Sequence, residues 1–177
     1  MKKVLLLTIF AALMMISSAA VAQTTASGTL NVTATVTGSI QLVFISDGAG
    51  VPLSGSGTST ATLAFGSVSA FGALGANISR SVVAGTSFTV STPVDVQVSK
   101  TNSASANYTL TAQLGAADAV NTWQVSGTTV TSASAATITA TGTYGSQTAE
   151  TIAITVPNAT PSGTLISNSI KYLATAN

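Results

Sequence analysis

The chain has 177 residues, of which 46% are hydrophobic and only 5% are charged, and it contains neither cysteine nor histidine. Soluble domains contain about 25% charged residues on average, and five Lys and Arg residues cannot form the basic surface that nucleic-acid binding requires. The commonest general base, the thiolate nucleophile and the usual zinc ligands are all missing. We therefore expect no nucleic-acid partner, no cofactor, no metal and no enzymatic activity.

The first 22 residues have the pattern of a bacterial secretory signal peptide. Two lysines precede an apolar run over residues 4–16, and a small–x–small triplet over residues 20–22 ends the segment. The run is shorter than the roughly 20 residues that span a bilayer. We expect cleavage after Ala22, export through the inner membrane and no membrane span in the mature chain. Without the two lysines, three basic and four acidic residues remain, which gives a net charge near −1.

The cleanest strand pattern in the mature chain covers residues 29–37. The apolar side chains Leu30, Val32, Ala34 and Val36 alternate with polar residues, mostly threonine, so they share one face of the expected strand. The same period of two continues along the chain, while helix-forming residues are nearly absent. The sequence therefore predicts an all-β protein.

The remaining predicted strands are short and separated by Gly, Pro and Ser turns. They cover residues 40–44, 61–65, 78–84, 86–91, 94–98, 108–114, 122–125 and 166–172, together with a hairpin in which residues 137–144 return through residues 152–156. A long glycine-rich loop is expected over residues 47–58, and Pro93 is expected to separate two strands. This spacing predicts an antiparallel, immunoglobulin-like β-sandwich over residues 38–177.

Residues 23–37 lie directly behind the expected cleavage site, at the free end of the mature chain. A terminal peptide with alternating apolar residues suits β-strand addition, in which it completes the sheet edge of another subunit. Burying the four apolar side chains would contribute on the order of 5–8 kcal/mol before ordering costs. The competing interpretation is that this strand pairs within its own domain, which periodicity alone favours.

Several motifs resemble the spore coat protein U group, which includes the archaic, Csu-type chaperone–usher pilins. They are residues 26–36 with Gly38-Ser39 behind them, Leu63-Ala64-Phe65-Gly66, Gly142-Thr143-Tyr144-Gly145 and Ile152-Ala153-Ile154-Thr155-Val156. The resemblance implies an incomplete immunoglobulin-like pilin whose N-terminal strand, residues 23–37, completes the next subunit. The donor-strand interface would then consist of Leu30, Val32, Ala34 and Val36.

The resemblance also implies partners and a destination. The partners are other copies of the protein or related pilin subunits, a periplasmic chaperone and an outer-membrane usher. The expected protein is a structural subunit of a pilus- or fimbria-like filament at the cell surface, assembled by donor-strand complementation and serving adhesion or biofilm formation. Residues 167–169 depart from the family pattern, because Ser, Asn and Ser interrupt the expected C-terminal apolar strand.

Other functions fit parts of the sequence. Trp123 and Tyr108 would form the sugar platform of a soluble secreted binding module, although core packing also explains their positions. The threonines at positions 137, 139, 141 and 143 have the spacing of an ice-binding face, which the solvated side of any strand shares. An uncharged β-rich chain also suits a functional amyloid subunit.

The four acidic residues of the mature chain are scattered, whereas glycoside hydrolysis needs two facing carboxylates. Turn chemistry explains Asp47 and Asp118, which lie in predicted turns, and Asp95 is expected to face outward. Glu150 has no neighbouring acidic residue in the sequence. We therefore expect no catalytic site among them.

Overall fold

The computed structural model describes residues 27–177. The predicted signal peptide and the first four residues of the predicted donor strand lie outside the described residues. The chain divides into two units, which meet between Thr35 and Val36. Residues 27–38 form no strand, and every one of their side chains is exposed. The alternation over residues 29–37 therefore belongs to no sheet of the described chain.

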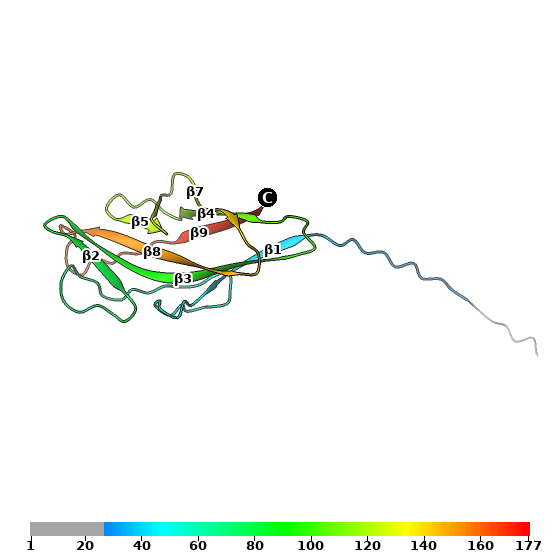
Figure 1. The fold of residues 1–177 in the computed structure, drawn as a ribbon, viewed down its shortest axis with the longest axis horizontal. Helices are drawn as coiled ribbons and strands as arrows, with labels where there is room; N and C mark the ends of the chain where they lie inside the picture. Colours follow the sequence, from blue (N-terminus) through cyan, green and yellow to red (C-terminus); the bar gives the residue numbers. More distant parts are fainter. Residues whose placement is uncertain (1–26) are drawn as a thin grey trace, which may run out of the picture. The chain divides into compact units, whose positions relative to one another are not determined.

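The second unit consists of strands and turns (Figure 1). The strands among its described residues are β1 (Ser39–Ile45), β2 (Ser79–Val83), β3 (Ser87–Thr101), β4 (Tyr108–Leu114), β5 (Thr122–Val125), β6 (Thr128–Val130), β7 (Ala136–Gly142), β8 (Gln147–Pro157) and β9 (Ile170–Ala176). One sheet has the order β1-β3-β8-β5-β6, with β2 also paired to β3, and the second has the order β7-β4-β9. All pairs are antiparallel. The predicted all-β antiparallel sandwich is confirmed. Within residues 27–177, no helix is long and apolar enough to cross a membrane.

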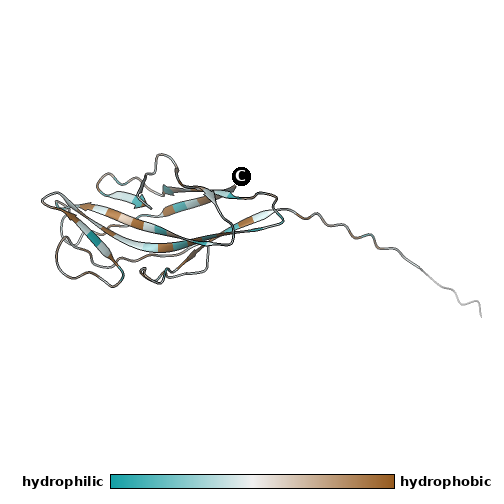
Figure 2. Ribbon diagram, viewed as in Figure 1, coloured by the Kyte–Doolittle hydropathy of each residue, from teal (hydrophilic) through white to brown (hydrophobic). Residues whose placement is uncertain are grey.

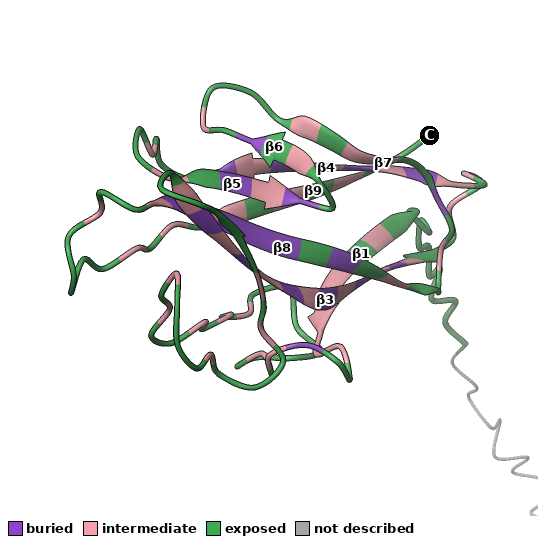
Figure 3. Cartoon of the chain, turned by 60° about the vertical axis from the view of Figure 1, so that its left-hand side comes forward, coloured by how far each residue is buried: buried purple, intermediate pink, exposed green. Residues whose placement is uncertain are grey.

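Strand β3 shows how the sequence builds the core. Its residues alternate between buried and partly exposed along most of its length, and the apolar ones face the second sheet. Figure 2 shows the same alternation as changing hydropathy along β3 and β8, and Figure 3 shows the buried residues of these two strands. The core-facing residues of the two strands are Phe88, Val90, Val94, Val96, Val98, Ile152, Ile154 and Val156.

The predicted break at Pro93 is wrong, because β3 continues through it. Strand β2 pairs with residues 87–91 of β3 and strand β1 with residues 95–101, so Pro93 lies opposite the gap between them. The missing N–H of Pro93 therefore leaves neither strand without a ladder bond. The buried hydroxyl of Thr92 bridges this gap, since it donates to Asn77 O (2.9 Å) and accepts from Val51 N (2.8 Å).

The predicted hairpin of residues 137–144 and 152–156 is also wrong. Strand β7 pairs with β4, whereas β8 pairs with β3 and β5, so the chain crosses between the sheets after Gly142. Alternation specifies the face on which each side chain lies but not the neighbouring strand. Irregular register opposite Leu110 also disturbs the threonine row: Thr139 is half-buried and donates to Glu150 Oε1 (3.5 Å).

Gly142 has a packing role that yields a prediction. A Cβ at this position would lie 2.2 Å from Cζ of the buried Tyr108 ring. We expect Gly142→Ala to lower the free energy of unfolding by about 1–3 kcal/mol, because the ring has to move within a packed core. Denaturant unfolding followed by the fluorescence of Trp123, the only tryptophan, measures the change.

Gly48→Ala is the matched control for this measurement. A Cβ at Gly48 meets no atom within 4 Å, so its effect should stay within about 0.5 kcal/mol. Equal effects of the two substitutions would show that Tyr108 does not require a glycine beside it.

Candidate functional site

The two sheets contact each other at both lateral edges, but less extensively between β1 and β9 than between β6 and β7. Strands β6 and β7 are in contact along one edge. On the opposite side β9 pairs with β4 alone, and its other edge carries no partner strand within residues 27–177. A free, partly apolar sheet edge is a template for pairing with another chain, so this edge is the first candidate for a binding site.

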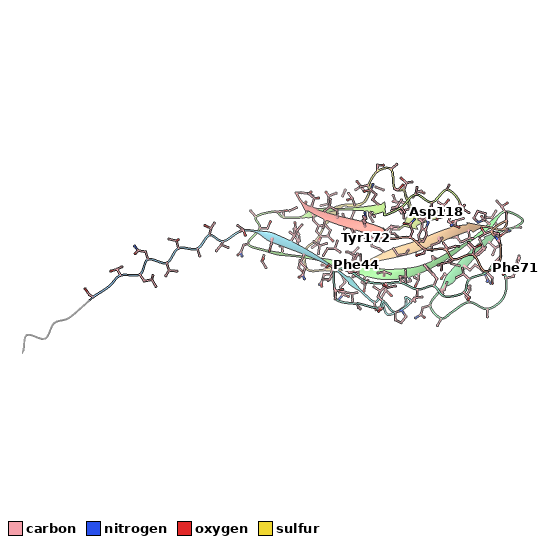
Figure 4. The ribbon with its side chains drawn as sticks, turned by 180° about the vertical axis from the view of Figure 1, so that it is seen from behind. Phe44, Phe71, Asp118 and Tyr172 are labelled. Carbon is pink, nitrogen blue, oxygen red and sulfur yellow. The ribbon has the colours of Figure 1, made fainter. Side chains whose placement is uncertain are left out.

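Two aromatic rings close one end of this open side. Phe44 of β1 and Tyr172 of β9 pack edge-to-face with ring centroids 5.2 Å apart and planes at 70° (Figure 4). Both rings rest on a buried cluster that includes Val96 and Leu110. Burial, and to a lesser degree Glu150, raises the pKa of the Tyr172 hydroxyl. We call this the closed end.

Next to the closed end lies an open groove with a volume of about 1810 Å³. Its first wall is residues 59–71, and its second wall is residues 160–172, which continue into β9. Its floor is the apolar face of the larger sheet, which contributes Phe88, Val90, Val94, Trp123, Ile152, Ile154 and Val156. The groove between the two walls is therefore lined by residues of the hydrophobic core, and these floor side chains are at most 8% exposed.

The first wall has the side-chain pattern of a strand without the ladder of one. Leu63 and Phe65 are half-buried against the core, and the residues between and beside them are exposed. Isolated bridges join Phe44 to Thr58 and Ser54 to Thr62, but residues 63–71 belong to no strand. Backbone N–H and C=O groups next to an apolar surface need partners, and an added strand would supply them.

The second wall explains the polar interruption at residues 167–169. The Asn168 side chain behaves like an additional peptide group: its Oδ1 accepts from Ala116 N (3.2 Å) and its Nδ2 donates to Ala116 O (3.0 Å). Gly115 N donates to Ser169 O (2.7 Å) beside it. These bonds attach the wall to the end of β4, while Ile166 and Ile170 pack against the core.

Asp118 holds Trp123 in the groove floor. Its carboxylate accepts hydrogen bonds from Val120 N (2.9 Å), Asn121 N (2.9 Å), Asn121 Nδ2 (3.0 Å) and Trp123 Nε1 (2.8 Å). Burial would raise the pKa of Asp118, but these bonds outweigh it and lower the pKa from 3.8 to about 2. The predicted turn role of Asp118 is confirmed, and the bond to Trp123 adds to it.

The other acidic residues lie in three different settings. Asp47 accepts from Ala49 N (2.7 Å) in the predicted turn. Burial, followed by the nearby Asp47 carboxylate, raises the pKa of Asp95. Glu150 is buried between the sheets, where it accepts from the hydroxyls of Ser126 and Thr139. Sequence reasoning missed this burial, although Glu150 takes an inward position of β8 two residues before the buried Ile152.

The structure also locates the predicted donor residues, the predicted sugar platform and the predicted ice-binding row. The predicted donor residues are exposed: Leu30 by 86%, Val32 by 81% and Val36 by 74%, and Ala34 is exposed as well. Trp123 and Tyr108 are 6% and 1% exposed, so they form core and not a surface platform. The threonine row of β7 is uneven at Thr139, which removes the flat face that ice binding would require.

Comparison with known proteins gives no relative on which to base a function. No family model, no curated protein and no solved structure matches the chain.

The Asp118 contacts predict a pH-dependent contribution to stability. We expect Asp118→Ala to lower the free energy of unfolding by about 2 kcal/mol at neutral pH, because the indole N–H of Trp123 and the turn amides lose a charged acceptor. Since the folded pKa lies below 3.8, this stabilisation is complete above that pH and disappears as the pH falls toward 2. Denaturant midpoints of both proteins between pH 2 and pH 7 measure it.

Asp47→Asn is the control, because an amide oxygen can still accept the single bond from Ala49 N. A stability difference between wild type and Asp118→Ala that stays constant down to pH 2 would contradict the role of the ionised carboxylate.

Proposed function

We propose that this protein is a structural subunit of a pilus-like surface filament, in which residues 23–37 of one copy fill the groove of another. We call residues 23–37 the donor segment. One observation carries the proposal: the domain has an apolar groove beside a free sheet edge, and the same chain carries an exposed segment with strand alternation that belongs to no sheet. Strand addition would give the groove and its free edge a partner strand and would give the segment a sheet in which to pair.

The dimensions of the two surfaces agree. Leu30, Val32, Ala34 and Val36 cover seven residues, or about 20 Å in a strand. The second wall offers the same length from Ile166 to Tyr172, with half-buried residues at alternate positions. Each apolar donor side chain can therefore face one inward position of the wall while the backbones form a ladder.

Charge is also compatible with insertion. The donor segment contains no charged residue. Among the described residues that line the groove, Lys171 alone is charged, and its side chain is exposed. Strand insertion would thus remove apolar and hydroxyl groups from water without burying an unpaired charge, which is the costly event in such interfaces.

Chain connectivity favours a second copy over the chain's own segment. Ser39 pairs with Thr101, past the closed end, and the Gly38 backbone packs on Asn102, where a Cβ would lie 2.8 Å from the carbonyl oxygen. A copy's own donor segment would have to reverse at Gly38 and pass the Phe44–Tyr172 pair. The segment of a second copy enters at the end of the groove farthest from the Phe44–Tyr172 pair, which we call the open end, and does not meet this obstacle.

The cellular route belongs to the same proposal. A subunit with an open apolar groove needs protection until assembly, which is the task of the periplasmic chaperone that the sequence resemblance implies, and an outer-membrane usher would deliver it to the surface. Export, filament formation and a role in adhesion or biofilm formation are consistent with a mature chain that carries so few charges.

The donor positions predict a face-specific effect on assembly. We expect Val32→Asp or Val36→Asp to weaken filaments by at least about a hundredfold, because a carboxylate would be buried in the groove. Thr33→Asp is the control, since residue 33 faces away from the groove in the same strand. The fraction of detergent-resistant polymer, measured by gel electrophoresis without heating, reports the effect. Equal losses for all three variants would remove the assignment of faces.

Deletion of the donor segment tests the direction of assembly. We expect a mature chain without residues 23–37 to keep a groove that binds the donor segment of an intact copy, but to add no further subunit. Mixed with intact protein, it should end filaments and shorten them in electron micrographs. Filaments of normal length and stability from the deleted chain alone would contradict donor-strand assembly.

A further inference from the structure

Two large apolar side chains in the groove walls face solvent. Phe71, at the end of the first wall, is 76% exposed, and Leu165, in the second wall, is 88% exposed. Both line the groove, and Figure 4 shows Phe71 well away from the closed end marked by Phe44 and Tyr172. A single exposed apolar residue needs no explanation, but two in the two walls of one apolar groove are positioned where one occupant of the groove could contact both.

The loop that carries Phe71 is held in place by Arg80 of β2, the only arginine in the chain. Its Nη1 donates to Ser69 O (3.0 Å) and to Gly72 O (3.1 Å), the carbonyls on either side of Phe71. The Ser69 hydroxyl donates to Phe71 O. Gly72 has φ +93°, a conformation that favours glycine. The chain thus uses its sole guanidinium to fix a turn that presents a phenyl ring to water.

We propose that Phe71 and Leu165 form a clasp that closes over the inserted donor segment, and that Arg80 is the positioning residue of this clasp. The inference rests on the proposed function. A donor segment that enters at the open end places Leu30 toward the closed end and Val36 beneath the clasp. An aromatic anchor whose loop is already ordered binds without a further ordering cost, which is the property of strong interface contacts.

The clasp acts mainly on the release of the donor segment. Its contacts form after the strand has entered, so they slow dissociation more than they speed association. Removing the phenyl or isobutyl group should raise the release rate about tenfold and change the association rate by less than about threefold. The clasp would therefore control the lifetime of each joint in the filament.

The experiment uses the mature chain with Val32→Asp, whose own donor segment is disabled while its groove is intact. A fluorescent peptide of residues 27–38 is bound to this host, and its release is followed after addition of excess unlabelled peptide. Phe71→Ser and Leu165→Ser are expected to raise the release rate about tenfold. Leu173→Ser is the matched control, because Leu173 is 64% exposed but does not line the groove, and its release rate should equal that of the host.

Arg80 is tested by coupling to Phe71. Arg80→Gln should raise the release rate nearly as much as Phe71→Ser. It should add little when Phe71 is already serine, because the turn that Arg80 holds then carries no side chain that contacts the peptide. Arg80→Lys should restore part of the slow release, since an ammonium can also donate to the two carbonyls. Additive effects of Arg80→Gln and Phe71→Ser would mean that Arg80 is only structural and would overturn its positioning role.

Three outcomes separate the clasp from the proposed function. Peptide that binds, with release unchanged by Phe71→Ser and Leu165→Ser, overturns the clasp and leaves donor-strand assembly standing. Peptide that does not bind the host overturns the proposed function and the clasp together. Filaments weakened by Phe71→Ser, with peptide release unchanged, would show that Phe71 contacts the body of the neighbouring subunit, which also overturns the clasp.

Discussion

The free edge of β9 is the constraint on which the rest of this domain depends. Two sheets can exclude water from the layer between them only where both lateral edges are closed, and here the edge beside β9 is closed by a single pair of rings, Phe44 and Tyr172. On one side of that pair the core is complete. On the other side the same sheet presents Phe88, Val90 and Trp123 to a groove. The described domain is therefore a sandwich in which a strand edge without a partner lies beside an apolar groove.

Several side-chain hydrogen bonds stabilise the domain around the groove and the neighbouring strands. Asp118 fixes the indole of Trp123 through a charged hydrogen bond, so the floor keeps its shape. Thr92 bridges the gap between β1 and β2 opposite Pro93. Arg80 orders the end of the first wall. Each bond satisfies a polar group beside the apolar core, where an unpaired polar group would be costly.

The sequence predicted the elements better than their arrangement. Alternation located β3, β4, β5 and β8 and their inward residues, because a period of two reports directly on which face is buried. Alternation does not report which strands pair, so the pattern predicted a hairpin of β7 and β8. It also predicted a break in β3 at Pro93, although neither β1 nor β2 pairs with Pro93 and no ladder bond to them is lost. Residues 29–37 show the clearest alternation in the chain and form no strand, because a strand also needs an edge on which to pair.

The groove itself could be predicted only in part. The donor residues were evident from alternation near a free terminus. The walls were not, because the short strands predicted over residues 61–65 and 166–172 gave no sign that these segments flank one groove, and the residues around them come from distant parts of the chain. The bonds of Trp123 to Asp118 and of Arg80 to the Phe71 turn depend on side-chain geometry that no local pattern specifies. Glu150 shows the same limit, because an inward position in β8 buries a carboxylate that its sequence neighbours would leave exposed.

The side chain of Asn168 has a mechanical consequence. By exchanging two hydrogen bonds with Ala116, it ties the second wall to the end of β4 at a point where the backbone of β9 has not yet begun. The second wall is thus attached to its own sheet by hydrogen bonds, and its position does not depend on an occupant of the groove. In the proposed filament, a pulling force on an inserted strand would pass from this wall into the smaller sheet through the Asn168 side chain, the Gly115–Ser169 bond and the ladder between β9 and β4.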